Sequence, residues 1–320
     1  MSEMSRSFIL TNGKGTGWLR DLPDYRDCSP DDEVIAKPIT EIKLKAQTGI
    51  ASSSPSVGGA PTVGAYSAVA AAPSLAATAD LRAWCSPIED QGNLGSCTAN
   101  AGVGLLEYFQ RRVYGNYVNA SRLFLYKVTR NLLHWTGDTG AFLRTTMKTM
   151  VNFGIPPEEY WPYNIPDFDK EPIAFLYSFA ENFKTTKYYR LDPPGTSRAV
   201  LLDRIKTNIA AGLPSMFGFT VYSSYTQASQ TGKIPFPVAG EGVVGGHAVD
   251  AVGYDDNKQI KNTSAGATQT TGAFLIRNSW GTGWGQQGYG WLPYDYVLKG
   301  LAVDWWSLID AEWPNLSAFN

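Results

Sequence analysis

Between Asp80 and the C-terminus, the spacing of apolar residues changes once, near residue 212. Upstream, apolar residues recur every three to four positions, as in "SCTANAGVGLLEYFQRRVYG", which Gly115 ends. Downstream, short runs rich in Val, Phe and Ile, such as "PSMFGFTVY", are separated by glycines. Helices followed by strands predict an α+β fold of two lobes, with residues 80–212 mainly helical and residues 213–320 mainly β.

The individual elements follow from the same two periodicities. Four helices are predicted, within residues 96–115, 121–133, 140–154 and 197–212. Three strands are predicted, within residues 214–222, 246–255 and 272–281. The glycine-rich stretch "GTGWGQQGYGWLPYDYV" continues the style of the strands. No repeat of fixed period is visible, so a repeat architecture is not expected.

The first 79 residues differ in composition from the rest of the chain. Residues 1–45 are a mixed segment in which "TGWLRDLPDYRDCSP", with its prolines and acidic residues, predicts an extended or turn-rich conformation rather than a helix. Residues 46–79 are rich in Ala, Ser, Gly and Pro and carry no charge, so they are predicted to be a linker. The linker is either a spacer within a flexible tail or a tether between a removable pro-segment and a domain that begins near Asp80.

Charge and cysteine content exclude several classes of protein. The 27 basic and 29 acidic residues nearly balance and form no basic block, which argues against nucleic acid or an anionic membrane as a partner. The chain has no 18-residue apolar run, and "MSEMSRSFIL" lacks a signal-peptide pattern. Three cysteines (Cys28, Cys85 and Cys97) are too few for a disulfide-stapled secreted fold. The expected location is the cytoplasm, with export by a route without a classical signal peptide left open.

One of these cysteines occupies a position that favours reactivity. Cys97 lies where a loop containing Gly95 and Ser96 meets the start of a predicted helix. The positive end of the helix dipole there favours thiolate over thiol. A lone cysteine is more often an inert, packed side chain, and position alone does not separate the two interpretations. A nucleophilic role therefore requires partner residues elsewhere in the chain.

The sequence contains two histidines that could act as the base. His134 lies at a predicted helix end in "NLLHWTGD", where a capping or surface role is expected. His247 opens an apolar strand in "VVGGHAVDAVGYDD", either as a base or as a core histidine. Asn278, in "FLIRNSWGTGWGQQGYGW", could fix the tautomer and orientation of a histidine ring, with Trp280 keeping water from that bond. On its own, the same stretch could be a glycine-rich structural hairpin.

Together, these stretches resemble the papain family of cysteine peptidases, and above all its bacterial branch. Gln91, the "GSC" that ends at Cys97, "GHAVDAVGY" around His247 and "NSWGTGWGQQGYG" around Asn278 match in order, over roughly residues 80–310. A joint match of separate blocks is far more specific than any one of them. The resemblance implies a papain-like two-lobe fold, with a helical N-terminal lobe, an antiparallel β-barrel-like C-terminal lobe and the active-site cleft between them.

The resemblance also implies catalytic roles. Cys97 would be the nucleophile, His247 its ion-pair partner and the proton donor to the leaving amine, and Asn278 the residue that orients the histidine. The side-chain amide of Gln91 and the backbone N–H of Cys97 would stabilise the oxyanion. No metal or other cofactor is expected, since two histidines without clustered cysteines do not form an ordinary zinc site.

Six further residues are implied to bind substrate or to shape the cleft: Gly140, Ala141, Phe142, Ala248, Trp280 and Trp284. The first three would offer backbone groups to an extended peptide by β-type pairing. Ala248 would help to form an apolar second subsite, whose far wall near residues 300–306 the resemblance leaves undefined. Of the two tryptophans, the first would shield the His–Asn bond and the second would line the leaving-group side.

The sequence departs from the family pattern at several positions. Leu94 replaces the cysteine usual three places before the nucleophile, so the disulfide made by that cysteine is not expected. Thr98 replaces the usual aromatic residue, and Gly246 replaces the frequent Asp or Asn before the histidine. The extra length between the predicted catalytic histidine and asparagine is assigned to a longer hairpin in residues 254–274.

The predicted function is hydrolysis of peptide bonds by a cysteine peptidase, an endopeptidase made as a proenzyme. Residues 1–45 would act as an inhibitory pro-segment across the cleft of the peptidase domain, residues 80–320, with 46–79 as the processing region; a passive tail is the alternative. The expected partners are a protein or peptide substrate and the chain's own N-terminal segment. Rival functions are those of an exopeptidase, of an amidase or transpeptidase with the same triad, and of a papain-like binding scaffold without activity.

Overall fold

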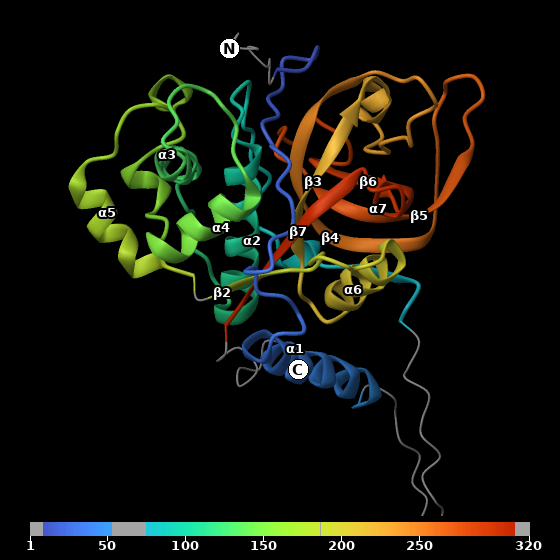
Figure 1. The fold of residues 1–320 in the computed structure, drawn as a ribbon, viewed down its shortest axis with the longest axis horizontal. Coiled ribbons are helices and arrows are strands. Elements are labelled where there is room, and N and C mark those ends of the chain that lie inside the picture. Colours follow the sequence, from blue (N-terminus) through green and yellow to red (C-terminus); the bar gives the residue numbers. More distant parts are fainter. Residues whose placement is uncertain (1–8, 53–74, 186, 311–320) are drawn as a thin grey trace, which may run out of the picture.

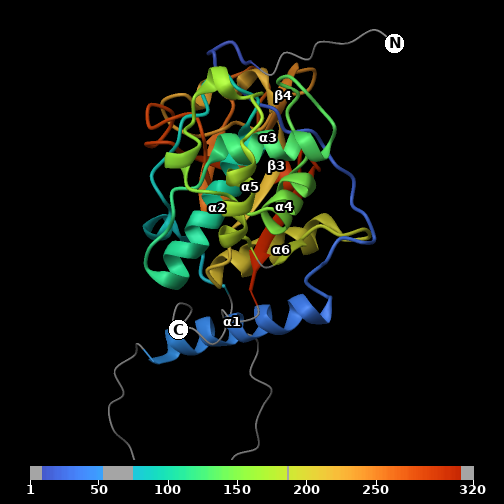
Figure 2. The same cartoon turned by 90° about the vertical axis from the view of Figure 1, so that its left-hand side faces the viewer.

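The computed structural model describes residues 9–52, 75–185 and 187–310. Figure 1 shows two lobes side by side, one made of helices and the other of a curved sheet, as the sequence predicts. The N-terminal part of the chain runs down between the lobes. It then reaches a helix that lies beneath the rest of the molecule in both views (Figures 1 and 2).

The helices of the structure are α1 (Glu33–Ser52), α2 (Cys97–Tyr114), α3 (Arg122–Leu132), α4 (Leu143–Asn152), α5 (Ala174–Ala180), α6 (Arg198–Ala210) and α7 (Asp295–Leu298). The four predicted helices correspond to α2, α3, α4 and α6. Gly115 ends α2 in the left-handed conformation, at φ 76°, which glycine adopts without steric cost. None of the helices in the described residues is long and apolar enough to cross a membrane.

Helix α2 is central, because it packs against strand β4 of the sheet and against α3 and α4 of the helical lobe. Every residue from Cys97 to Phe109 is buried, so the N-terminal two thirds of the helix has no solvent face. Gly104 permits the close approach to the sheet, since a Cβ there would lie 2.1 Å from Nη1 of Arg277. A helix fixed on all sides holds its first residue, Cys97, rigidly between the lobes.

The strands are β1 (Thr78–Asp80), β2 (Lys187–Arg190), β3 (Ser215–Tyr222), β4 (Val243–Lys261), β5 (Gln269–Arg277), β6 (Tyr289–Pro293) and β7 (Ala302–Ile309). They pair antiparallel in the order β2-β7-β3-β4-β5-β6, and β1 adds to β4. The predicted barrel-like lobe is thus an open sheet in the described residues, with β2 and β6 at its edges. The three predicted strands correspond to β3, β4 and β5.

The predicted long hairpin is present. Strands β4 and β5 continue their pairing outward from Asp255↔Ala273 to Lys261↔Gln269. In Figure 1 this hairpin projects from the β lobe at the right-hand side. The extra residues between His247 and Asn278 therefore form the outer part of this hairpin.

The stretch from residue 16 to residue 30 contains no helix, as predicted, but the rest of the segment does, and this helix runs past the predicted start of the linker. Helix α1 runs from Glu33 to Ser52, with Pro38 inside it. Ile35, Ile39 and Ile42 bury one face of this helix, and α1 packs against β7. The free energy gained by burying these three isoleucines outweighs the cost of the helical hydrogen bond that Pro38, which has no N–H, cannot make. The predicted linker also includes the first two residues of β1, Thr78 and Ala79, while its residues 53–74 lie outside the described part.

The lobe boundary predicted at residue 212 is not strict. Strand β2 lies in the half expected to be helical, yet it pairs with β7 from Lys187↔Ile309 to Arg190↔Trp306. The sheet therefore draws one edge strand from the first half of the sequence. Short strands such as β2 carry too few residues to display a clear period of two.

Candidate active site

Cys97 is the first residue of α2 and is completely buried. Burial raises the pKa of its thiol to about 12, because the thiolate would lose its hydration. Hydrogen bonds from the backbone of Ala248, Thr98 and Trp18 act in the opposite direction but do not outweigh burial. The helix N-terminus alone does not make this cysteine a thiolate in the closed structure, contrary to the expectation from its position.

His247 and Asn278 are brought together by the pairing of β4 with β5. Nε2 of His247 lies 2.8 Å from Oδ1 of Asn278. The ring of Trp280 stacks on the imidazole, with centroids 4.5 Å apart and planes at 22°. Nδ1 of His247 has no hydrogen-bond partner within the described residues. Burial lowers the pKa of His247 to about 4, although its bond to Asn278 raises it, so the imidazole is neutral at pH 7.

Gln91 is buried and is tied to the same cluster. Its Nε2 donates to the carbonyl oxygen of Leu94 at 2.8 Å, and its Oε1 accepts from Oγ of Ser279 at 2.5 Å. The backbone N–H of Ser279 in turn donates to Oδ1 of Asn278 at 2.8 Å. Ser279, which the sequence analysis did not single out, therefore connects the predicted oxyanion residue with the predicted histidine-orienting residue.

The predicted substrate backbone site is occupied by the chain itself. The N–H of Ala141 donates to the carbonyl oxygen of Gly17 at 2.9 Å, and the N–H of Leu19 donates to the carbonyl oxygen of Ala141 at 3.1 Å. These two bonds form a parallel bridge between Trp18 and Ala141. Residues 14–19, called the cleft stretch below, thus use the β-type pairing predicted for an extended peptide.

The cleft stretch also contacts the opposite wall of the site. The N–H groups of Gly17 and Trp18 both donate to the carbonyl oxygen of Gly246, each at 3.1 Å. Nε1 of Trp280 donates to the carbonyl oxygen of Gly15 at 3.0 Å. Since Ala141 belongs to the helical lobe and Gly246 to β4, the stretch bridges both lobes directly over the buried thiol.

Two glycines make this close approach possible. A Cβ at Gly15 would lie 2.1 Å from the carbonyl oxygen of Leu94, and one at Gly17 would lie 2.0 Å from that of Gly95. Gly17 also has φ 120°, a conformation that L-residues rarely adopt. Any side chain at Gly17 would therefore push the stretch away from the loop that precedes Cys97.

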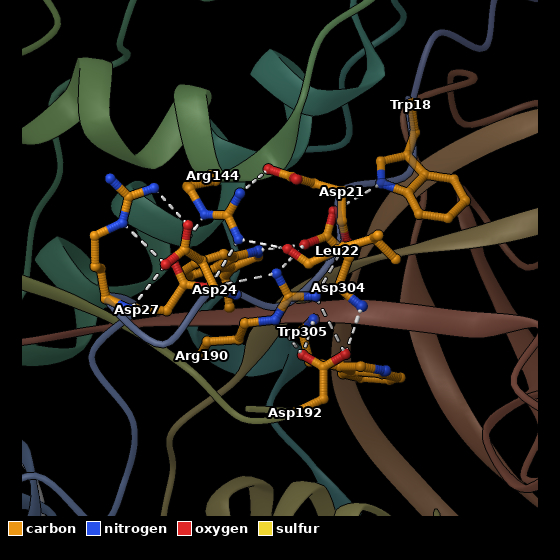
Figure 3. Close-up of polar contacts among 12 residues, drawn as sticks. Trp18, Asp21, Leu22, Asp24, Asp27, Arg144, Arg190, Asp192, Asp304 and Trp305 are labelled. Carbon is orange, nitrogen blue, oxygen red and sulfur yellow. Dashed lines mark hydrogen bonds and ion pairs between the residues drawn. The ribbon is translucent and has the colours of Figure 1, made fainter. Parts of the chain in front are cut away.

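Charged contacts hold the next part of the chain, residues 20–27, called the acidic stretch below. Arg144 of α4 binds the carboxylates of Asp21 and Asp27, with Nε at 2.7 Å from Oδ1 of Asp27. Its Nη2 also donates to the carbonyl oxygen of Leu22 at 2.7 Å. Figure 3 shows Arg144 among these acceptors, with Arg190 beside them. Arg144 thus ties the acidic stretch to the helical lobe, while Nη2 of Arg190, in β2, donates to the carbonyl oxygen of Asp21 at 3.3 Å.

The remaining predicted residues lie around the same cleft. Gly140 has φ 70° and a Cβ there would meet the carbonyl oxygen of Gly17, while Phe142 precedes α4 and its ring lies 5.5 Å from that of Trp135. Trp284 packs edge-on against Trp280, at 5.5 Å between centroids. Both tryptophans line an open groove of about 610 Å³, together with Lys14, Asp90 and other residues.

The comparisons with known proteins agree with this arrangement. A family model described as papain family cysteine protease matches residues 75–298. The crystal structure of xylellain, a cysteine protease from Xylella fastidiosa, is similar with a TM-score of 0.67 and 29% identity, over 92% of this chain and 96% of that chain. An uncharacterized peptidase C1-like protein of Acanthamoeba polyphaga mimivirus is 34% identical over 237 residues, 72% of each chain. Cathepsin K of Gallus gallus is 30% identical over 215 residues, 65% of this chain and 55% of its own length.

The chain belongs to the papain family of cysteine proteases. It is a cysteine-type peptidase, so the predicted family, fold and enzyme class are confirmed, as is the similarity to a bacterial member. The individual roles of Gln91, Cys97, His247 and Asn278 remain predictions, although the structure brings these side chains to one place. His134 is exposed at the end of α3, apart from this cluster, as a surface role predicts.

Three residues that shape the site lie outside the predicted motifs. Trp18 was part of a quoted stretch but was not identified as a contact residue. Gly218 and Asp304, which surround its indole, lie in strands where no motif points to a function. Only their position in the sheet, on β3 and β7, brings them to the cleft, so no local sequence signal could have identified them.

Proposed function

We propose that the chain is a cysteine endopeptidase made as a proenzyme, with Cys97 as nucleophile and the N-terminal segment as its inhibitor. The observation that carries the proposal is the cleft stretch, which lies over a fully buried Cys97 and pairs with Ala141. Peptide hydrolysis requires these groups to be exposed to a substrate. The segment must therefore leave the cleft before catalysis.

In the open enzyme, Cys97 and His247 would form a thiolate–imidazolium pair. Sγ of Cys97 attacks the scissile carbonyl carbon, and the side-chain amide of Gln91 and the N–H of Cys97 stabilise the resulting oxyanion. The imidazolium gives its proton to the leaving amine as the C–N bond breaks, which leaves a thioester. His247 then removes a proton from water, the hydroxide oxygen attacks the thioester, and the departing thiolate completes the cycle. Asn278 keeps Nδ1 of His247 directed at the sulfur by holding Nε2.

The cleft stretch would prevent this chemistry in two ways. It occupies the backbone positions at Ala141 and Gly246 that an extended substrate needs. It also excludes water, and burial raises the pKa of Cys97 to about 12 and lowers that of His247 to about 4. The catalytic pair is therefore neutral in the closed chain. Within the cleft stretch, the backbone of Trp18 forms a hydrogen bond with the thiol of Cys97.

Other activities of the same triad are kept as alternatives. An amidase or a transpeptidase would form the same thioester and differ in the acyl donor or the acceptor. An exopeptidase would need a group that binds a chain terminus. A binding scaffold would not need the His247–Asn278 bond of 2.8 Å or the Gln91–Ser279 bond of 2.5 Å, and the presence of both favours an enzyme.

The test compares four proteins: the full-length chain, residues 80–320, and the Cys97→Ala variant of each. Their rates are measured on a mixed fluorogenic peptide library under reducing conditions. The proposal predicts activity in residues 80–320, much weaker activity in the full chain, and none in either variant. Equal rates for the two lengths would leave a peptidase without an inhibitory segment. Stoichiometric labelling of Cys97 without peptide hydrolysis would favour another acyl substrate, and no labelling at all would favour a binding scaffold.

A further inference from the structure

The indole of Trp18 fills a side-chain pocket next to the predicted catalytic residues. Its flat face lies on Gly218 of β3 and Gly246 of β4, and the side chain is almost completely buried. A Cβ at Gly218 would lie 1.9 Å from Cε2 of the indole, and a Cβ at Gly246 would lie 2.9 Å from Cε3. Any residue larger than glycine at these two positions would therefore fill the space that the ring occupies.

Asp304 of β7 forms the far end of this pocket. Its Oδ2 accepts a hydrogen bond from Nε1 of Trp18 at 3.0 Å (Figure 3). Its Oδ1 accepts from Nε1 of Trp306 at 2.7 Å and lies 3.1 Å from Nη1 of Arg190. The carboxylate is completely buried, and its neighbouring cation, Arg190, also forms an ion pair with Asp192 at 3.0 Å. Oδ2 is thus the oxygen that faces the indole.

The same pocket would be open to a substrate once the cleft stretch has left. Trp18 is the residue whose backbone is bridged to Ala141, the predicted pairing site for an extended peptide. A substrate residue that pairs with Ala141 would place its side chain between Gly218 and Gly246. The empty pocket would then present a buried carboxylate oxygen that has lost its indole donor, and leaving such an acceptor unpaired is unfavourable.

We propose that Asp304 is a specificity-determining residue, which selects peptide substrates with tryptophan at the position that pairs with Ala141. The inference rests on the proposed peptidase function and specifies its substrate class. The two glycines accept a flat bicyclic ring, and Oδ2 of Asp304 accepts its N–H. Phenylalanine would leave that oxygen unpaired. Arginine could also donate to it, so arginine is the competing side chain that the test includes.

The first test compares substrates on the wild-type enzyme. The intact chain is folded, and its N-terminal segment is then removed by proteolysis between α1 and β1. Values of kcat/KM are measured at pH 8 for peptides that differ only at the selected position, which carries tryptophan, 3-benzothienylalanine, phenylalanine, leucine or arginine. Benzothienylalanine has the size of tryptophan but sulfur in place of the N–H. The expected preference for tryptophan over benzothienylalanine is at least about tenfold, because a site built to bind an N–H rejects analogues that lack it.

The Asp304→Asn variant assigns this preference to one side chain. Asparagine tolerates the φ of 64° at this position, and its amide NH₂ would face the pocket when its oxygen faces Arg190. The ratio of tryptophan to benzothienylalanine should fall to about one, and this ratio within each enzyme is the readout, because the substitution can also change the absolute rates. The matched control is Asp203→Asn, an exposed aspartate on α6, which should keep the wild-type ratio. A wild-type ratio near one, a preference for arginine, or an unchanged ratio in Asp304→Asn would overturn the proposal.

A second experiment on the intact chain needs no peptidase activity. Alkylation of Cys97 by iodoacetamide is measured for Trp18→Phe, Asp304→Asn and the double variant. If Asp304 recognises the indole N–H, each single variant speeds alkylation, and the double variant is no faster than the faster single one. Additive effects of the two substitutions on the alkylation rate would show that Asp304 does not bind the indole N–H, and would overturn the proposal. If the freed enzyme cleaves no peptide, the proposed function fails, and this cycle still decides whether Asp304 binds the indole.

Discussion

The two stretches of the N-terminal segment are held by different forces, although they follow each other in the chain. The cleft stretch is bound mainly by buried backbone hydrogen bonds to Ala141 and Gly246, with two glycines that allow close contact, and has one ion pair at its start, between Lys14 and Asp90. The acidic stretch is bound by carboxylates on Arg144, whose side chain is about one quarter exposed, at 24%. Backbone contacts without solvent depend on shape, whereas partly exposed ion pairs depend on salt and contribute less.

The two stretches therefore have different roles: the cleft stretch blocks the active site, and the acidic stretch tethers the segment to the protein. Of the two stretches, only the cleft stretch contacts the thiol, through the backbone of Trp18, so only this stretch contributes directly to the pKa of Cys97. The acidic stretch lies on the helical lobe and increases the local concentration of the cleft stretch at the site. Variants in the first stretch should therefore change both the occupancy of the cleft and the reactivity of the thiol, and variants in the second should change occupancy alone.

The largest effect is expected from Cys97→Ala, which removes the chemistry and leaves both stretches in place. Peptidase activity of the freed enzyme should fall by about 10⁴-fold or more, because the nucleophile is lost. The loss is measured as kcat/KM on a peptide cleaved by the wild type. The control is Asp203→Asn, an exposed side chain of α6 that stays in the freed enzyme, which should keep wild-type activity. Residual activity within tenfold of wild type would refute Cys97 as the nucleophile.

The pH dependence of Cys97 alkylation should show whether the cleft stretch neutralises the catalytic pair. With a pKa of about 12 for Cys97, the thiolate fraction in the closed chain rises about tenfold per pH unit, so labelling should increase about 100-fold between pH 7 and pH 9. After removal of the N-terminal segment, the ion pair with His247 should make the rate nearly flat between pH 6 and pH 8. Mass spectrometry of the labelled peptides separates Cys97 from Cys28 and Cys85. A flat profile for the intact chain would contradict the neutral pair.

Gly17→Ala should weaken the binding of the cleft stretch and leave the contacts of the acidic stretch in place. The added Cβ would lie 2.0 Å from the carbonyl oxygen of Gly95, and alanine is strained at φ 120°. Backbone strain of this kind costs about 1–3 kcal/mol, so alkylation of Cys97 in the full chain should speed up by about tenfold or more.

Gly13→Ala is the matched control for this variant. Gly13 also has a left-handed φ, 76°, but a Cβ there would meet no atom within 4 Å. It carries backbone strain without a clash, so its effect on Cys97 alkylation should be clearly smaller. Equal rates for the two variants would mean that close contact with the Gly95 loop does not hold the cleft stretch.

The smallest effect is expected from Arg144→Gln, which weakens only the acidic stretch. Loss of the contacts with Asp21 and Asp27 should raise Cys97 alkylation about threefold, since partly exposed ion pairs contribute about 1 kcal/mol or less. The effect should shrink at high salt, which screens the wild-type contacts as well. Lys148→Gln removes the same charge one turn along α4, from an exposed side chain, and should leave the rate unchanged. A tenfold effect of Arg144→Gln would place the main binding energy in the acidic stretch.

Much of the fold could be predicted because the elements concerned are long and periodic. Helix α2, with Gly115 at its end, and strands β3, β4 and β5 follow directly from the spacing of apolar residues. Helix α1 was missed because Pro38 and the surrounding polar residues obscure the three buried isoleucines. Short elements such as β2 and α5 carry too few residues for a clear period, and their conformation depends on what they pack against.

The candidate site also has features that the sequence predicts and features that it does not. Its four predicted catalytic residues lie in short, conspicuous motifs, and the structure brings them together by pairing β4 with β5 at the start of α2. The pKa values could not be predicted, because the helix N-terminus favours the thiolate and burial in the folded chain, which includes the cover by Trp18, outweighs it. The residues around the indole could not be predicted either, since Gly218 and Asp304 are 86 positions apart (304 − 218) and lie in ordinary strand sequence.

The sequence by itself determined the family, the two-lobe α+β fold and the identity of the candidate triad, because local motifs and periodicity encode them. Only the tertiary structure decided what covers Cys97, which wall ends the pocket beside it, and which contacts hold the N-terminal segment. These features depend on distances between residues far apart in the chain, such as Trp18 and Asp304. The free energy of burial and of long-range hydrogen bonds arises only when the sheet brings such residues together, so no local pattern records it.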